Sequence, residues 1–235
     1  MTDIPAEAPP RPPIRTFVRR LGRISDAQRR AFAAHGAEFC IPFANTAIDL
    51  TAAFGRAAPL LVEVGSGMGH ALLETAAARP DWNHLGIEVH RPGVAAVIKG
   101  ALERGLTNIR MVEADAVQVL ASAIREDSVA QMHIFFPDPW PKARHHKRRL
   151  LQAPFVQLAA SRLAVDGRLL LATDWQPYAD AMLAVLDDEP LLLNDSGRGN
   201  FSARPAERPI TRFERRGLAL GHDIADLIYR RRGSA

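Results

Sequence analysis

The sequence predicts an α/β fold with a mostly parallel, seven-stranded sheet and helices packed on both of its faces. Five short apolar runs, at 60–64, 84–89, 108–113, 129–136 and 167–173, alternate with segments of helical periodicity. This alternation is typical of repeated strand–helix–strand units, which build parallel sheets. Two later apolar runs, at 191–193 and 224–229, predict an antiparallel pair at one edge of the sheet.

The segments between the strands predict helices at 69–79, 92–103, 116–124, 149–163 and 175–187. Another helix precedes the sheet, because Ser25 and Gln28 have the spacing of a capping box that opens a helix through Phe39. Residues 1–14 are rich in proline and poor in apolar side chains, which predicts a disordered extension. The remaining residues, 15–235, have the length of a single domain.

The composition narrows the class of protein. A 47% apolar content permits a substantial core, and the single cysteine, Cys40, excludes a disulfide framework. Since there is no long apolar run and prolines stand where a signal peptide would be apolar, we expect a cytoplasmic protein without membrane contact. Lysine and arginine number 30 against 26 acids, a balance that permits an anionic partner without requiring one.

Three glycines, Gly65, Gly67 and Gly69, directly follow the first strand and precede a helix. Backbone amides and the helix start can therefore approach a ligand with no side chain between them. The glycines alone fit a tight turn equally well. Glu63 distinguishes between two classes of ligand. Its carboxylate repels the pyrophosphate of a dinucleotide and attracts the ammonium and sulfonium groups of S-adenosylmethionine.

Two more acids stand at the ends of the next two strands. Glu88 lies 25 residues after Glu63, the spacing of an acid that accepts ribose hydroxyls in α/β nucleotide sites. Asp115 follows the third strand, where its carboxylate is placed to accept from an adenine amino group. Either acid alone could be a solvated strand end or a helix cap. Three acids at one sheet edge favour S-adenosylmethionine as the cofactor.

The fourth strand is followed by a stiff run from Pro137 to Lys142. Its alternating prolines predict extended conformations for Asp138 and Trp140, so that an acid, an aromatic face and a cation lie beside the cofactor edge. A rigid turn with a buried tryptophan is the alternative.

The segment from Lys142 to Arg149 carries five lysines and arginines among eight residues. A cationic patch beside a candidate active site predicts contacts with RNA phosphates, although a solvated helix start has the same composition. His145 and His146 are adjacent and lack a third ligand nearby, so we predict no metal site.

Taken together, EVGSGMG, GIEVH, EAD, FFPDPWPKARHHKRR, ATDW and PITRFERRG resemble the bacterial tRNA (guanine-N7)-methyltransferases over about residues 15–232. The resemblance implies a Rossmann-like class I methyltransferase that acts on guanosine 46 in the variable loop of tRNA. The implied products are 7-methylguanosine and S-adenosylhomocysteine. Nothing in the sequence predicts a metal or an obligate protein partner.

The resemblance also assigns roles to individual residues. It implies cofactor contacts at the glycine loop and at the acids Glu63, Glu88, Asp115 and Asp138, with Asp138 also catalytic. Substrate contacts are implied for Lys142, Asp174, Thr211, Arg212, Phe213 and Glu214. RNA contacts are implied for Arg144, His145, His146, Lys147, Arg148 and Arg149. Thr211 and Glu214 also have the spacing of a capping box, and Asp174 is placed to cap a helix.

The chemistry requires little from the protein beyond alignment. Guanine N7 has a lone pair and no proton, so methyl transfer needs no general base, and Asp138 or Asp174 would orient the base or stabilise its new charge. One rival is a nicotinamide-dependent oxidoreductase, which Glu63 and the GxGxG spacing oppose. The other is a non-catalytic RNA-binding protein, which the intact acidic set opposes.

Overall fold

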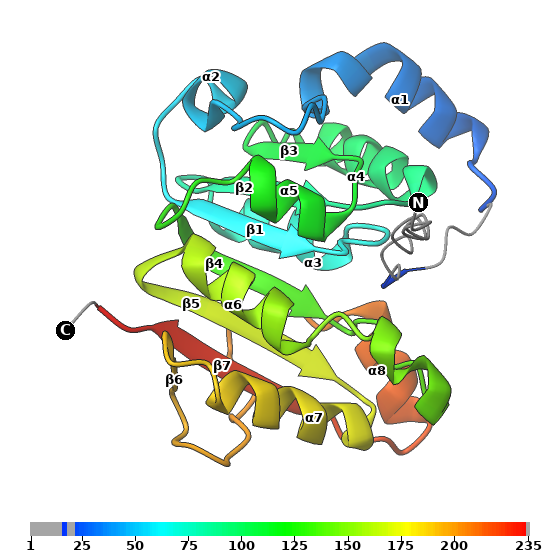
Figure 1. Ribbon diagram of the computed structural model, residues 1–235. Coiled ribbons are helices and arrows are strands. Elements are labelled where there is room, and N and C mark those ends of the chain that lie inside the picture. The colour runs from blue at the N-terminus through cyan, green and yellow to red at the C-terminus, as the bar shows by residue number, and fades with distance from the viewer. Residues whose placement is uncertain (1–15, 18–21, 234–235) are drawn as a thin grey trace, which may run out of the picture.

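The computed structural model describes residues 16–17 and 22–233, and these form one sheet covered by helices (Figure 1). The strands are β1 (Leu60–Val64), β2 (Asn83–Ile87), β3 (Ile109–Val112), β4 (Val129–Phe135), β5 (Leu163–Thr173), β6 (Leu192–Asn194) and β7 (Ala225–Arg231). Their order is β3-β2-β1-β4-β5-β7-β6. The first five run parallel, and β7 is antiparallel to both β5 and β6. The predicted class and the antiparallel edge pair are confirmed, while the predicted disorder of 1–14 lies outside the described residues.

Helices cover both faces, as predicted. One face carries α1 (Asp26–Phe39), α3 (His70–Ala78) and α4 (Arg91–Arg104). The other carries α2 (Leu50–Phe54), α5 (Ala116–Ser122), α6 (Ala153–Arg162) and α7 (Gln176–Asp187). Every residue of β1 and β2 is buried, as expected for central parallel strands enclosed by helices. In the part of the chain that the structure describes, no helix is both long and apolar enough to cross a membrane.

The last helix, α8 (Arg212–Ala219), lies beside the carboxyl ends of β4 and β5 (Figure 1). Gly217 allows this position, because a Cβ atom there would lie 3.0 Å from Oδ2 of Asp174, just after β5. The long connection from β6 to β7 therefore brings one helix to the edge where the parallel strands end.

Element boundaries differ from the sequence prediction in three places. The predicted helix at 149–163 begins only at Ala153, and the preceding residues form the 3₁₀ helix η1 (Ala143–Arg148). Pro154 in the first turn favours this late start. β5 begins at Leu163, because Leu163 pairs with Val129 before an irregularity in the register. The short helix α2 was not predicted.

The predicted capping box at the start of α1 is confirmed. Ser25 Oγ accepts from the backbone N–H of Gln28 at 3.3 Å, and Gln28 Oε1 accepts from the backbone N–H of Ser25 at 2.9 Å. This reciprocal pair satisfies two backbone donors that the helix itself leaves unpaired.

Candidate functional site

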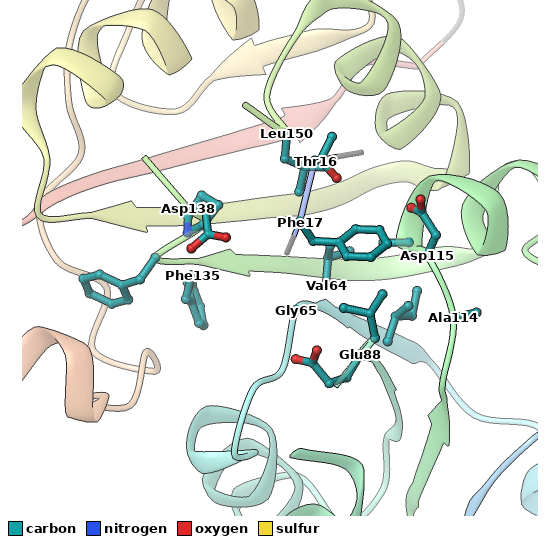
Figure 2. Close-up of a pocket in the computed structure, with 15 residues that line it drawn as sticks. Thr16, Phe17, Val64, Gly65, Glu88, Ala114, Asp115, Phe135, Asp138 and Leu150 are labelled. Atoms are coloured by element: carbon teal, nitrogen blue, oxygen red, sulfur yellow. The ribbon is translucent and has the colours of Figure 1, made fainter. Parts of the chain in front are cut away.

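Two adjoining pockets lie at the carboxyl ends of the parallel strands. The first has a volume of about 230 Å³ and lies between Glu88, Asp115 and Asp138, which follow three different strands (Figure 2). The second, of about 440 Å³, extends from Glu63 and the glycine loop to Thr211, Arg212 and Phe213. Both are lined by Gly65, Phe135 and Phe136, so they meet above the end of β4. This is the ligand edge of open α/β sheets.

The glycine loop requires its glycines. Gly65, Gly67 and Gly69 have φ values of 72°, 54° and 80°, in the left-handed region that favours glycine. A Cβ atom at Gly69 would also lie 2.3 Å from Cγ2 of Val97 on α4. The loop therefore passes close to the helices with its backbone exposed to the pockets, as a cofactor cradle requires.

Glu88 joins the glycine loop to the end of β2. Its Oε2 accepts from the backbone N–H of Gly67 at 2.6 Å, and its Oε1 accepts from the backbone N–H of His90 at 2.9 Å. A carboxylate has about four lone-pair sites, so hydroxyl groups of a ligand can still donate to it. The sequence placed Glu88 at the cofactor edge, and its second role in holding the loop comes from the fold.

Asp115 combines both interpretations that the sequence left open. Its Oδ1 accepts from the backbone N–H of Val117 at 2.9 Å and so caps α5. The same side chain lines the first pocket, across from Asp138 in Figure 2. Capping fixes the carboxylate in place beside the ligand space.

Glu63 is the most unusual acid of the site, because its side chain is buried within β1 and still lines the second pocket. The pKa of Glu63 is raised to about 8, mainly by burial and also by the nearby Glu88, while the backbone N–H of Leu72 opposes the shift. Among the described residues, Glu63 Oε2 has no hydrogen-bond partner. Because Glu63 lines the second pocket, a cationic ligand group there would balance the charge of its carboxylate, so this acid fits the ammonium of S-adenosylmethionine.

After β4 the chain forms a ledge, by which we mean residues 137–147. Asp138 lies on this ledge, as predicted, and is exposed at the first pocket. The predicted extended conformation of Trp140 is wrong, since its φ is 44°. Tertiary contacts hold it there, because Trp140 Nε1–H donates to Thr16 O at 3.3 Å and the Arg148 guanidinium lies 3.9 Å from the ring centroid. Phe136 is also left-handed, with a φ of 51°, which turns the chain sharply at the end of β4.

The basic segment divides into an inner and an outer set. Arg149 is buried, donates from Nε to Pro139 O at 2.9 Å and covers the Tyr178 ring, so it supports the ledge. Arg148 also contacts the ledge through Trp140. His145 is half-buried and meets the Trp140 ring edge-on. The exposed members are Lys142, Arg144, His146 and Lys147.

The start of α8 forms the outer wall of the second pocket. Thr211 Oγ1 accepts from the backbone N–H of Glu214 at 3.1 Å, so the predicted helix cap is present. Phe213 is 62% exposed, and its ring centroid lies 6.3 Å from that of Phe136 with the two planes tilted by 25°. Arg212 is exposed beside it.

Glu214 instead points into the protein and does not line either of these pockets. Its Oε2 accepts from Nη1 of the fully buried Arg208 at 2.6 Å. Arg208 Nε also lies 2.6 Å from Asp226 Oδ1 on β7, and Arg204 pairs with the other oxygen of Glu214. The Arg208 guanidinium is 5.9 Å from the centroid of Phe135, which lines both pockets. This network fastens the start of α8 to the sheet.

Two other predicted substrate residues also lie outside the lining of the two pockets. Asp174 Oδ2 is 3.5 Å from Nδ1 of His222 and packs against Gly217 of α8. Lys142 is exposed at the start of η1. Asp174 is half-buried, whereas Lys142 is open to solvent.

Several lining residues were not predicted. Phe17, which precedes α1, lines the first pocket, and Phe136 and Arg216 line the second. Phe17 and Arg216 come from the two ends of the chain, and no local pattern connects them with the strand ends. The contact between Arg208 and Phe135 was not predicted, because buried charges are rare and leave no periodic pattern in the sequence.

Comparison with solved structures shows a shared fold. The fold is similar to that of the 16S rRNA methyltransferase KamB, with a TM-score of 0.56 and 14% identity over 91% of this chain and 97% of that one. It is also similar to the antibiotic-resistance methyltransferase Kmr, with a TM-score of 0.55 and 19% identity over 83% and 96%. The model of a family described as "Putative methyltransferase" matches residues 57–227. Fold and site define a Rossmann-like, S-adenosylmethionine-dependent methyltransferase.

Curated relatives narrow the class to one family. A tRNA (guanine-N(7)-)-methyltransferase of Thiobacillus denitrificans is 49% identical over 97% of this chain and 99% of its own length. The enzymes of that name from Paraburkholderia xenovorans and Leifsonia xyli are 52% and 54% identical over 99% and 92% of this chain, and 89% and 95% of their own lengths. This chain belongs to the tRNA (guanine-N(7)-)-methyltransferase family. The family inferred from the sequence motifs is thereby confirmed.

Proposed function

We propose that this chain transfers a methyl group from S-adenosylmethionine to N7 of guanosine 46 in the variable loop of tRNA. The observation that carries the proposal is the meeting of the two pockets at Gly65, Phe135 and Phe136. One pocket holds acids suited to a nucleoside, and the other opens outward past Phe213. Family membership supports guanine N7 in tRNA, and the sequence resemblance supports position 46. Because the substrate is tRNA, we place the reaction in the cytoplasm, without an obligate protein partner.

Different residues of this chain would bind different parts of the cofactor. Glu63 would bind its ammonium group, Glu88 its ribose hydroxyls and Asp115 its adenine amino group. Gly65, Gly67 and Gly69 would let backbone amides approach it. When bound, S-adenosylmethionine supplies a methyl group that is activated by a positively charged sulfur, and its remainder leaves as S-adenosylhomocysteine.

Alignment of the acceptor base is the main task of the protein. Guanine N7 attacks with its lone pair and loses no proton, so none of these residues acts as a general base. A bond forms between N7 and the methyl carbon while the carbon–sulfur bond breaks and sulfur keeps the electron pair. The purine gains a positive charge, which Asp138 can stabilise, or Asp138 can accept from the N1–H and the exocyclic amine. Asp174 is the second candidate acceptor.

Cations on two sides of the site suit an RNA substrate. The exposed cations are Lys142, Arg144 and Lys147 on the ledge side and Arg212 on α8, and the exposed His146 lies among the first three. Phosphate contacts from such groups supply much of the affinity for nucleic acids. We propose that these residues bind the tRNA backbone on either side of the target nucleotide, with Thr211 and Phe213 at the base.

The test is transfer of labelled methyl to tRNA transcripts, followed by chain cleavage selective for 7-methylguanosine. We expect cleavage at position 46 alone, and a transcript with adenosine at that position should take up no label. Label at another base or another site would refute the proposal, and so would binding of S-adenosylmethionine without transfer.

A further inference from the structure

Four polar side chains form a row behind the second pocket, and three of them are buried. Glu63 on β1 and His133 on β4 are direct neighbours in the sheet, and Gln131 lies two residues before His133 on the same face. Glu63 Oε2 is 3.7 Å from His133 Nδ1, His133 Nε2 is 2.8 Å from Gln131 Nε2, and Gln131 Oε1 is 2.7 Å from Arg79 Nη1. Glu63, His133 and Gln131 are each at most 3% exposed.

The row has one direction of hydrogen-bond donation. Arg79 has only donors, so the Gln131 atom that it contacts must be the amide oxygen. The amide nitrogen of Gln131 then faces His133 Nε2 as a donor, and His133 Nε2 must be the acceptor. A neutral imidazole with an accepting Nε2 carries its hydrogen on Nδ1. That hydrogen faces the carboxyl group of Glu63.

The surroundings of His133 keep it neutral. Burial is the main cause that lowers the pKa of His133 to about 3, and Arg79, His84, Arg168 and Arg208 contribute to this shift. The groups that act on Glu63 are Glu88, which raises its pKa, and the backbone N–H of Leu72, which lowers it. His133 therefore faces Glu63 as a neutral imidazole and not as a charge.

Both facing atoms need this contact. Within the described residues, Glu63 Oε2 and His133 Nδ1 are buried without hydrogen-bond partners, which is costly for each. A small approach of the two side chains would satisfy both at once. This contact would stabilise the ionised form of Glu63 most, because a hydrogen bond to a charged acceptor is stronger than one to a neutral acceptor.

We propose that His133 is a positioning residue for Glu63, donating from Nδ1 to its carboxylate so that the other oxygen faces the ammonium of the cofactor. Gln131 and Arg79 fix the imidazole in the tautomer that can do this. The inference rests on the proposed cofactor site, and it adds a residue that never touches the ligand.

The test compares two ligands that differ only at the end which Glu63 would bind. S-adenosylhomocysteine carries the amino-acid group, and 5′-methylthioadenosine lacks it. For His133→Leu we expect S-adenosylhomocysteine to bind about tenfold more weakly or worse, the effect of losing a hydrogen bond to a charged group. The affinity for 5′-methylthioadenosine should change by less than about twofold, which also shows that the pocket has folded.

Two further variants separate positioning from packing. His133→Asn puts an amide nitrogen where Nδ1 stands, since both are bonded to Cγ, and should recover most of the affinity for S-adenosylhomocysteine. His84→Leu is the control, because His84 is an equally buried histidine on β2 that bonds to Arg79 O and not to Glu63. It should leave the ratio of the two affinities unchanged.

The pH profile gives an independent readout. For His133→Leu, the pH at which the affinity for S-adenosylhomocysteine is half-maximal should rise by about one unit, because Glu63 ionises less readily. A nitrogen-15 spectrum of the wild-type imidazole should show the neutral tautomer with its hydrogen on Nδ1. A hydrogen on Nε2, or equal losses of both ligands in His133→Leu, would overturn the inference. Failure of the wild-type protein to bind S-adenosylhomocysteine would instead overturn the proposed cofactor site.

Discussion

Glu63 is an acid that the protein alone leaves without a balancing positive charge. The unfolded chain ionises it at a pKa near 4.5, whereas burial raises the pKa in the folded protein to about 8. Between these values the folded state holds a proton that the unfolded state has released. Its contribution to the free energy of unfolding therefore falls as the pH rises through this range. The buried acid therefore destabilises the ligand-free protein, while its carboxylate attracts a cationic ligand.

The first prediction concerns Glu63→Gln. Because glutamine does not ionise, the ligand-free variant should melt a few degrees above the wild-type protein at about pH 8, and the difference should disappear near pH 4.5. Its affinity for S-adenosylhomocysteine should fall about a hundredfold, since the ammonium loses its charged partner. Thermal unfolding at several pH values and calorimetric titration measure the two effects. Glu74→Gln on the exposed side of α3 is the control, and an identical pH trend there would contradict the assignment.

The second prediction concerns Asp138→Ala. If the carboxylate stabilises the methylated base, the rate of methyl transfer should fall about a hundredfold or more, while S-adenosylmethionine should bind nearly as well. Single-turnover transfer and equilibrium binding of the cofactor separate the two. Equal losses in both would assign Asp138 to cofactor binding alone.

At this scale the sequence identifies acids and glycines but not their partners. Glu63, Glu88 and Asp115 were placed correctly at one sheet edge, because parallel strands all end there. The backbone donors of Glu88 and the neighbour His133 were not predicted. The pairing of Glu63 with His133 depends on the register between β1 and β4, which are far apart in the chain.

Among the elements, α8 depends on one buried arginine. Arg208 joins Glu214 at the helix start to Asp226 on β7, and the helix carries Thr211, Arg212 and Phe213 at the pocket rim. The helix has few buried residues of its own, namely Glu214 and Gly217. Its position is therefore set by the ion network more than by apolar packing.

The third prediction concerns Arg208→Met, which breaks the buried ion pairs of Arg208 with Asp226 and Glu214 and leaves Glu214 only its pair with the more exposed Arg204. Breaking such a pair costs about 3–5 kcal/mol, and we expect the cost to appear as local unfolding of α8. Backbone amides of 212–219 should exchange hydrogen faster, and the tRNA Michaelis constant should rise, while S-adenosylmethionine binds normally. The exposed Arg198→Met is the control, because Arg198 pairs with Asp188 outside this network. Unchanged exchange in α8 would show that the network does not hold the helix.

Whether a segment forms a helix or a strand was easier to predict than the residues at which it begins and ends. Strong apolar runs gave all seven strands, since burial on both faces leaves a continuous signal. α2 has only five residues, too few to show a helical period, and it is defined by the Asp49 cap and the left-handed Gly55. The conformation of Trp140 was predicted wrongly because tertiary contacts with Thr16 and Arg148 outweigh the preference of a residue before proline.

Over the whole molecule, exposed cations are present at the end of the sheet that carries the pockets, including Arg144 and Lys147 on the ledge and Arg212 on α8. The sequence showed the cluster at 142–149, but it did not show that Arg149 turns inward. Nor did it show that α8 brings further arginines to the same end, because that placement follows from the long β6–β7 connection.

The fourth prediction is that removing ledge charges changes the salt dependence of tRNA binding. In Arg144→Ala/Lys147→Ala, the slope of log affinity against log salt should flatten by about 0.7–0.9 for each phosphate that the variant no longer neutralises, because fewer counterions are released. The matched control, Arg104→Ala/Arg125→Ala, removes two charges at the opposite end of the strands, where α4 ends and β4 is about to begin, and should keep the wild-type slope. Affinity is measured by filter binding at several salt concentrations. If both double variants flatten the slope equally, the effect is one of net charge, and the ledge is not the surface that meets the tRNA backbone.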